Sequence, residues 1–509
     1  MKKNFRDISL AALSGVLTFL AFPPFEFAFL GWVCLVPLLA VIRKDNPRQN
    51  FRYAYLSGVV FFGCLLYWLV NVTVPGMVIL VAILSVFYGL FGLLAGYVLK
   101  YSMDLLLLPF VWVVLEYLRS NLFTGFPWGL LGHTQYKNIN LIQVADITGA
   151  YGISFLLVIF NMAVFAWFTR SGRKIAYMMV ALLFMMIATT YGMRRLNNDQ
   201  HIWGSPRISV VQGNIPQQLK WDAKFAKDII KEYTGLTMET AKDAPDMIIW
   251  PETAYPYLVE KGKTGAEEID ALASQIEIPV LAGIIYTENG VYYNSAAVFN
   301  GKQKPADIYN KIHLVPFGEY VPLGRSLSFL RNHIDKPIGD FGKGEEYTLL
   351  PVKSTRSSYA ANGTIQRQTN FYKCGVLICF EDIFPYITRG FVQKGANFIV
   401  NITNDAWFGE TAASRQHLQS SVFRAVENRV PVVRSANTGI SCFIDPAGRI
   451  SPGVDVEEKE IFVSGFATGN IDIYIGRTVY TVYGDIFVYF CGFMMALLFI
   501  MAGFFLKKE

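Results

Sequence analysis

Eight apolar stretches, each about long enough to cross a lipid bilayer, constrain the fold of this chain more than any other feature. A helix needs about 20 mainly apolar residues to cross the hydrocarbon core. The stretches lie at residues 8–22, 26–42, 53–71, 76–99, 103–118, 150–168, 175–192 and 485–506. We therefore predict a multi-span α-helical membrane domain of about eight transmembrane helices, seven from residues 1–192 and the last from residues 485–509.

Lysine and arginine residues gather at alternate ends of these stretches. They lie within residues 2–6, 43–52, 170–174 and 507–508 and at Lys100, whereas the loops FPPFEF and NVTVPG carry none. Positive charge in short loops marks the cytoplasmic side of a membrane protein. We expect both termini in the cytoplasm, and we attribute the net charge of +6 to topology rather than to a nucleic acid partner.

Residues 193–484 have the composition of a separate folded domain, which this topology places outside the cytoplasm. Short β-branched runs such as RISVVQ, DMIIW and CGVLICF alternate with polar, helix-compatible segments such as EEIDALASQIE. That alternation predicts a layered α/β domain. The six cysteines form no CxxC pair and no HExxH pattern occurs, so we expect no metal. Whether Cys374 and Cys442 pair stays open.

Three short stretches each bring a reactive side chain to the end of an apolar strand, where an α/β domain usually exposes its site. IIWPET contains Glu252, NKIHLVPFGEYVP contains Lys311 and Glu319, and LICFED contains Cys379. Burial and nearby charges can shift the pKa of a group held there. Cys379 is the candidate nucleophile, and Glu252 could take its proton. Lys311 could hold the oxyanion of a tetrahedral intermediate, and Glu319 could orient Lys311 or Glu252.

Each of these residues also has an ordinary structural interpretation. A cysteine at the end of an apolar strand is more often a small core residue, and an isolated lysine in a loop is usually solvated. A glutamate before a threonine can cap a helix. His313 and His417 are likewise more often structural than catalytic. Spacing alone does not decide between these alternatives.

Taken together, the three stretches resemble the Glu-Lys-Cys triad of the nitrilase superfamily. The whole chain resembles the apolipoprotein N-acyltransferase family, the membrane-embedded branch of that superfamily. The resemblance runs in order through GFPWGLLGHTQ, VVQGNIPQQLKWD, WPET, NKIHLVPFGEYVP, ICFED and NITNDAWFG. It implies a nitrilase-like αββα sandwich over residues 193–484.

The resemblance also implies roles for single residues. Glu252 would be the general base, Lys311 the oxyanion stabiliser, Cys379 the nucleophile that becomes a thioester, and Glu319 a support for this triad. The family also treats the positions of Glu381 and Trp221 as important for activity or acyl-chain handling.

Three further positions belong to the predicted site by the same resemblance. Phe380 stands where many members carry a tyrosine, so aromatic packing is kept without a hydroxyl. Trp128 lies in the GFPWGLLGHTQ motif as a supporting residue. Arg119, at the outer end of the fifth span, could meet a phosphate or mark the membrane interface.

The implied reaction moves an sn-1 acyl chain from a phospholipid, such as phosphatidylethanolamine, to Cys379, releasing a lysophospholipid. The α-amino group of a diacylglyceryl-cysteine on an apolipoprotein then takes the acyl chain in a ping-pong scheme. No cofactor is implied, and we expect a multi-pass monomer in the bacterial inner membrane with its catalytic domain on the periplasmic side. The segment LGRSLSFLRNHI could be a membrane-touching lid that presents Leu323, Leu327 and Leu330 to lipid.

Two rival hypotheses remain. A membrane-tethered amidase of the nitrilase type would let water resolve the Cys379 thioester, but hydrolysis of small amides needs no eight spans. A non-catalytic membrane protein would carry a broken triad, whereas Glu252, Lys311 and Cys379 are all present.

Overall fold

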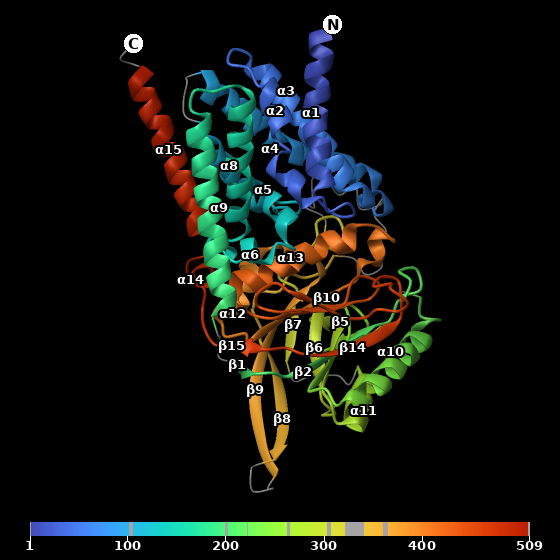
Figure 1. The fold of residues 1–509 in the computed structure, drawn as a ribbon. Coiled ribbons are helices and arrows are strands. Elements are labelled where there is room, and N and C mark those ends of the chain that lie inside the picture. The colour runs from blue at the N-terminus through green and yellow to red at the C-terminus, as the bar shows by residue number, and fades with distance from the viewer. Residues whose placement is uncertain are drawn as a thin grey trace. The chain divides into compact units, whose positions relative to one another are not determined.

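The chain divides into two compact units in the computed structural model (Figure 1). The structure describes residues 2–100, 105–198, 202–220, 222–261, 265–302, 307–320, 340–359 and 365–506. Unit 1 comprises Met1–Asp199, Thr411–Glu427 and Thr478–Glu509, and unit 2 comprises Gln200–Glu410 and Asn428–Arg477. A stretch from inside the predicted 193–484 domain, Thr411–Glu427, is thus part of unit 1.

Unit 1 is helical. Its α-helices are α1 (Lys2–Leu20), α2 (Val36–Val41), α3 (Pro47–Leu65), α4 (Val74–Lys100), α5 (Leu107–Asn121), α6 (Ile139–Ile142), α7 (Ala145–Thr148), α8 (Ala150–Phe168), α9 (Lys174–Asn197), α13 (Ala413–Asn428), α14 (Val479–Tyr483) and α15 (Ile486–Leu506). Three 3-10 helices lie between them, η1 (Ala28–Trp32), η2 (Tyr67–Asn71) and η3 (Leu131–Gln135).

The predicted membrane spans are confirmed in part. Within the described residues, α4, α8 and α9 are long and apolar enough to cross a membrane. Helices α1, α3, α5 and α15 cover four more of the predicted stretches. The stretch 26–42 is not one helix but η1 followed by α2, because Pro37 lies in the first turn of α2, where its missing N–H favours a helix start.

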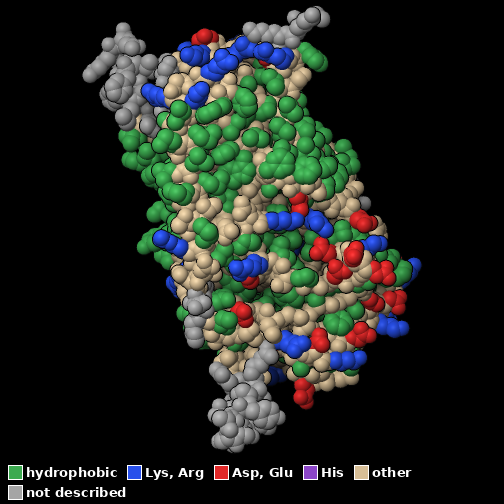
Figure 2. All heavy atoms as spheres, viewed as in Figure 1, with side chains coloured by type: hydrophobic (Ala, Val, Ile, Leu, Met, Phe, Trp, Pro, Cys, Tyr) green, Lys and Arg blue, Asp and Glu red, His purple; other side chains and the backbone are tan. Residues whose placement is uncertain are grey.

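Close packing and bonded polar groups hold unit 1 together. Helices α3 and α4 approach closely at Gly92, where an added Cβ would lie 2.4 Å from the Ala54 Cβ. The buried Asn161 side chain accepts from the N–H of Leu35 (2.8 Å) and donates to the carbonyl of Gly31 (2.9 Å). Such partners matter in lipid, where an unpaired backbone group is costly. Figure 2 shows hydrophobic side chains gathered over the helices of unit 1.

Unit 2 is built on two β-sheets. The first has the strand order β14-β2-β3-β5-β6-β7, with β4 beside β5, and the second has the order β13-β12-β11-β10-β9-β8. The strands of the first sheet are β2 (Arg207–Gln212), β3 (Met247–Ile249), β4 (Leu258–Glu260), β5 (Val280–Glu288), β6 (Val291–Phe299), β7 (Ile308–Asn310) and β14 (Gly465–Asn470). Those of the second are β8 (Leu350–Tyr359), β9 (Ile365–Ile378), β10 (Phe398–Thr403), β11 (Val432–Ala436), β12 (Cys442–Ile444) and β13 (Ile450–Pro452). A separate pair joins β1 (Ile202–Gly204) to β15 (Ile473–Tyr474).

The two sheets stack face to face, and helices pack against them. Ser435 Oγ in β11 lies 3.2 Å from the carbonyl oxygen of Val211 in β2 and 3.1 Å from that of Ile249 in β3. Tyr233 of α10 (Ala226–Thr240) stacks on Trp250 at a centroid distance of 4.9 Å. The other α-helices among the described residues of this unit are α11 (Glu267–Ile276) and α12 (Pro385–Gln393). The predicted layered αββα fold is thereby confirmed.

Strand direction brings the candidate site together. Strands β2, β3 and β5 run parallel, as do β9, β10 and β11, and β7 runs with β5 because both are antiparallel to β6. Glu252, Lys311 and Cys379 follow the carboxyl ends of β3, β7 and β9. Sheet topology therefore gathers three residues that are far apart in the chain at one edge of the sandwich.

Candidate active site

Cys379 follows β9 directly and opens a 3-10 turn, η6 (Cys379–Ile383). Its φ of 54° lies in the left-handed region, which costs a non-glycine residue about 1–2 kcal/mol. The side-chain amide of Asn401 in β10 donates to the carbonyl oxygens of Cys379 (3.2 Å) and Leu377 (3.3 Å). The strained turn is thus held in place by the neighbouring strand, as is typical of functional sites.

Lys311 lies between two carboxylates. Its Nζ is 2.9 Å from Glu319 Oε1 and 3.8 Å from Glu252 Oε1, and its side chain is 1% exposed. The side-chain amide of Asn294 in β6 donates to both carboxylates, at 2.8 Å to Glu252 and 2.9 Å to Glu319. The N–H of Val315 donates to the second oxygen of Glu319 (2.8 Å). Glu319 is therefore firmly bonded, while Glu252 is held at a longer distance from the ammonium.

The charges of these groups set the chemistry of the thiol. Burial raises the pKa of Cys379 above its ordinary value, the Glu252 carboxylate raises it further, and the Lys311 ammonium opposes both. Burial alone would lower the pKa of Lys311, but Glu319 and Glu252 raise it, so this lysine stays charged. At neutral pH the thiol is protonated, and nucleophilic attack therefore requires a base beside it.

Glu381 joins the cysteine turn to the lysine loop. Its fully buried carboxylate accepts from the N–H groups of Ile378 (2.8 Å), Ile312 (2.7 Å) and His313 (3.0 Å), and from the hydroxyl of Tyr309 (2.8 Å). Burial raises the pKa of Glu381 to about 7, against the opposing effect of Lys311 and these donors. The carboxylate thus positions the residue before Cys379 and the two residues after Lys311 at the same time.

Phe380 belongs to an aromatic cluster beside the nucleophile. Its ring packs edge-on against Phe384 at 5.2 Å, and His313 stacks on Phe384 at 3.7 Å. His313 Nδ1 is also 2.7 Å from the hydroxyl of Tyr386. These contacts are those of a histidine with a structural role in packing. Trp221 and the predicted lid with Leu323, Leu327 and Leu330 lie outside the described residues.

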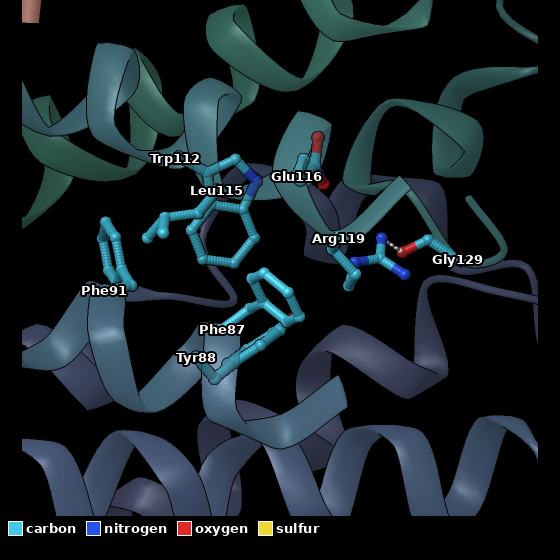
Figure 3. Close-up of a pocket in the computed structure, with 8 residues that line it drawn as sticks. All are labelled: Phe87, Tyr88, Phe91, Trp112, Leu115, Glu116, Arg119 and Gly129. Carbon is cyan, nitrogen blue, oxygen red and sulfur yellow. Dashed lines mark hydrogen bonds between the residues drawn. The ribbon is translucent and has the colours of Figure 1, made fainter. Parts of the chain in front are cut away.

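Arg119 and Trp128, also predicted as site residues, belong to unit 1. The guanidinium of Arg119 donates to the carbonyl oxygens of Phe126 (3.0 Å), Trp128 (2.7 Å) and Gly129 (3.3 Å). Figure 3 shows Arg119 in a pocket that is mainly aromatic and also lined by Glu116. The indole N–H of Trp128 donates to Gln416 Oε1 of α13 (3.0 Å). Both residues hold polar contacts inside the helical unit.

Two polar residues of the site were not predicted. Asn294 bridges the two carboxylates, and Lys220, which is 4% exposed, donates from Nζ to the carbonyl oxygen of Glu252 (2.7 Å). Their signals in the sequence were an asparagine inside the apolar run YNSAAVF and a lysine in the QLKWD motif. All six cysteines are free thiols, so Cys374 and Cys442 do not pair. Among the described residues, no group of three or more His, Cys, Asp or Glu side chains could hold a metal ion.

Comparisons with known proteins cover nearly the whole chain. Residues 14–163 match the family described as the apolipoprotein N-acyltransferase N-terminal domain, and residues 207–472 match the carbon-nitrogen hydrolase family. An apolipoprotein N-acyltransferase of Geobacter metallireducens is 36% identical, over 96% of this chain and 93% of that protein. One of Methylococcus capsulatus is 32% identical, over 94% and 92%. The crystal structure of a Saccharomyces cerevisiae nitrilase-superfamily member aligns with 53% of this chain and 91% of its own, at 17% identity and a TM-score of 0.39.

Proposed function

Because this chain belongs to the apolipoprotein N-acyltransferase family, we propose that it transfers a fatty acyl chain from a membrane phospholipid to the N-terminal amine of a diacylglyceryl-cysteine on an apolipoprotein. The single observation that carries the proposal is the buried Lys311 ammonium between Glu252 and Glu319, at the same edge of the two-sheet sandwich as Cys379. That set supplies a nucleophile, a base and a positive charge for an oxyanion.

The first half-reaction forms a thioester. Cys379 Sγ attacks the sn-1 ester carbonyl of the donor, phosphatidylethanolamine in this proposal, while Glu252 takes the thiol proton. Lys311 stabilises the negative oxygen of the tetrahedral intermediate. The ester C–O bond then breaks, and Glu252 returns the proton to the departing oxygen of the lysophospholipid. The raised pKa of Cys379 supports a base-assisted attack rather than a thiolate already present at neutral pH.

The second half-reaction consumes the thioester. The neutral α-amino group of the acceptor attacks the thioester carbonyl, and Glu252 takes a proton from the attacking nitrogen. The C–S bond breaks, the amide forms, and the proton returns to the Cys379 thiolate. Glu319 holds Lys311 throughout through its 2.9 Å ion pair, and neither half-reaction requires a cofactor.

The membrane setting of the proposal follows from the substrates. Donor and acceptor both carry acyl chains that stay in a bilayer, so a catalytic unit at the outer face of the bacterial inner membrane meets them without extracting them into water. The apolar surface of unit 1 and the three helices that are long and apolar enough to span a membrane among its described residues support membrane residence. We place unit 2 on the periplasmic side and take the working form to be a monomer.

Intact-protein mass spectrometry tests the proposal directly. The purified chain is mixed with phosphatidylethanolamine and compared with Cys379→Ala, with hydroxylamine used to release thioesters. We expect an acyl adduct on the native chain that hydroxylamine removes and that the variant lacks, together with released lysophospholipid. No adduct on a folded native chain, with several phospholipids tried, would contradict the proposal.

The acceptor step needs a separate measurement. After the adduct has formed, a diacylglyceryl-cysteine peptide is added and the loss of adduct is followed together with the mass of the peptide. Transfer raises the peptide mass by one acyl chain. If the adduct instead decays to free fatty acid at the same rate with and without peptide, the chain is a hydrolase that uses water as its acceptor.

A further inference from the structure

The loop after β2, residues 213–220, is clamped to the carboxyl ends of two strands of the other sheet. The side chain of Asn437, which follows β11, accepts from the N–H of Ile215 (2.9 Å) and donates to its carbonyl oxygen (2.7 Å). Asn404, which follows β10, donates to Gln217 (2.7 Å) and accepts from Asn437 (3.0 Å). Asn404 and Asn437 are both buried. The path of this loop is therefore set by β10, which pairs with β9, and by β11, which pairs with β10.

This clamped loop delivers a second buried cation to the site. Lys220 is 4% exposed, and its Nζ donates to the carbonyl oxygen of Glu252 at 2.7 Å. Among the residues that the structure describes, Lys220 forms no ion pair with a carboxylate. A buried ammonium bonded to a neutral carbonyl gives up hydration without a directly paired charge, which costs several kcal/mol in general. A lysine whose role was only to fill space would not carry that cost.

We propose that Lys220 is a positioning residue for the reaction, which acts through Glu252 by holding its backbone and by placing a positive charge beside the Glu252 and Cys379 pair. This inference rests on the proposed roles of Glu252 and Cys379. Lys311 and Lys220 then have different tasks. Lys311 is paired with Glu319 and faces the developing oxyanion, whereas Lys220 holds the backbone of the base and favours the ionised state of the nucleophile.

The charge of Lys220 gives the proposal a pH signature. Burial lowers the pKa of Lys220 to about 8, although Glu252 and Cys379 act in the opposite direction. Because electrostatic attraction is mutual, the same ammonium favours the anionic form of Cys379. Lys311 and Asp405 also act on the thiol, but they are unchanged by substitution at position 220. Lys220 therefore assists thiol ionisation below pH 8 and loses that effect as it deprotonates above pH 8.

The rate at which Cys379 is alkylated measures the effect of the Lys220 charge on ionisation of the thiol, and this assay needs no acyl donor. The full-length chain in detergent micelles reacts with iodoacetamide between pH 6 and pH 10, and intact mass gives the rate. All variants are made in a chain that carries Cys64→Ala, because Cys64 is the other thiol that is not buried. This Cys64→Ala chain is the background against which their rates are compared. We expect Lys220→Met and Lys220→Gln to react about tenfold more slowly than the background below pH 8. The ratio of the background alkylation rate to the rate of either Lys220 variant should fall to about twofold or less by pH 9.5.

The two substitutions separate charge from hydrogen bonding. Glutamine can still donate to the Glu252 carbonyl but carries no charge. If the charge is what matters, the alkylation rate of Lys220→Gln should therefore equal that of Lys220→Met. Native rates in Lys220→Gln, or a ratio to the background that is constant from pH 6 to pH 10, would overturn the proposal. Lys224→Met, which removes an exposed charge from the same region, should match the background at every pH. Because no phospholipid is present, a failed acyl transfer test leaves this result interpretable.

Discussion

Both units bury strongly polar side chains, but they bond them differently. In unit 1 the Arg119 guanidinium donates to three backbone carbonyls. Gln416 Oε1 accepts from the indole N–H groups of Trp68 (3.1 Å) and Trp128 (3.0 Å). In unit 2 the Lys311 ammonium is 2.9 Å from one carboxylate and 3.8 Å from the other. These two groups of unit 1 are bonded closely to neutral partners, while the site of unit 2 holds one carboxylate apart from its ammonium.

That difference separates stability from reactivity. A buried polar group bonded within the fold stabilises it, and removing its partner leaves a desolvated atom unpaired. A carboxylate held near an ammonium and a thiol, but not locked to either, can accept a proton during a reaction. Substitutions in unit 1 should therefore lower stability first, and substitutions around Glu252 should lower activity first.

Glu252→Gln is expected to have the largest effect. The amide keeps the size of the side chain but removes the base, so we expect acyl-enzyme formation to slow by about 10³-fold. The unfolding temperature should change little, because Asn294 can donate to the amide oxygen of the new residue. Rates of adduct formation and thermal unfolding, both in detergent, check this prediction.

A matched control is available on α11. Glu267→Gln removes an exposed carboxylate of the same unit and should leave the rate within about twofold, because exposed charges are screened. If Glu252→Gln kept more than a tenth of the native rate, Glu252 would not be the base, and the contrast between the two units would fail.

Lys311→Met should lower both activity and stability. Loss of the ammonium removes the charge for the oxyanion, which we expect to slow adduct formation by about 10²–10³-fold. It also leaves Glu252 and Glu319 unneutralised in a buried site, at a cost of about 3 kcal/mol in unfolding free energy. Denaturant unfolding and adduct kinetics measure the two effects separately.

A double variant then separates those two effects. Adding Glu319→Gln to Lys311→Met removes one of the stranded carboxylates, so part of the lost stability should return while activity stays low. Recovery of activity in the double variant would mean that Lys311 serves only to neutralise Glu319.

Gln416→Leu tests the helical unit. It leaves the indole N–H groups of Trp68 and Trp128 without their acceptor, and we expect a loss of about 2 kcal/mol in stability. Adduct formation per folded molecule should stay within about threefold of the native value. Gln275→Leu, at an exposed position of α11, is the control and should leave stability within about 0.5 kcal/mol. A Gln416→Leu chain of native stability that had lost its activity would reverse the comparison.

The layered domain and the grouping of Glu252, Lys311 and Cys379 could be predicted from the sequence, because each residue ends an apolar strand in a recognisable motif. Lys220 and Asn294 could not. Asn294 lies inside an apolar strand, and only the pairing of β6 with β5 and β7 places it between two carboxylates. The position of Lys220 depends on the loop that Asn404 and Asn437 hold in place, and these two residues are more than 180 residues away along the chain.

Helix α13 shows the same limit in unit 1. Its sequence ASRQHLQSSVFRAVEN is polar enough to predict a solvent-facing helix. In the structure its side chains are mostly buried, and they make specific contacts, such as the hydrogen bond that Gln416 accepts from Trp128 (3.0 Å) and the stacking of His417 on Trp128 at 5.4 Å. Burial of a polar helix depends on partners contributed by distant segments, and a local pattern does not carry that information.

The smallest expected effect comes from Cys374→Ala, on the strand that directly precedes the nucleophile. Cys374 is fully buried in β9, and burial raises its pKa to about 12, so it is an inert core thiol. Its loss should lower stability by about 1 kcal/mol through a small cavity and leave adduct formation within about twofold of native. Cys379→Ala should do the reverse, with no adduct and little change in stability. Because one variant removes a thiol within β9 and the other removes the thiol directly after β9, equal losses of activity would assign the effect to packing of β9 rather than to chemistry at Cys379.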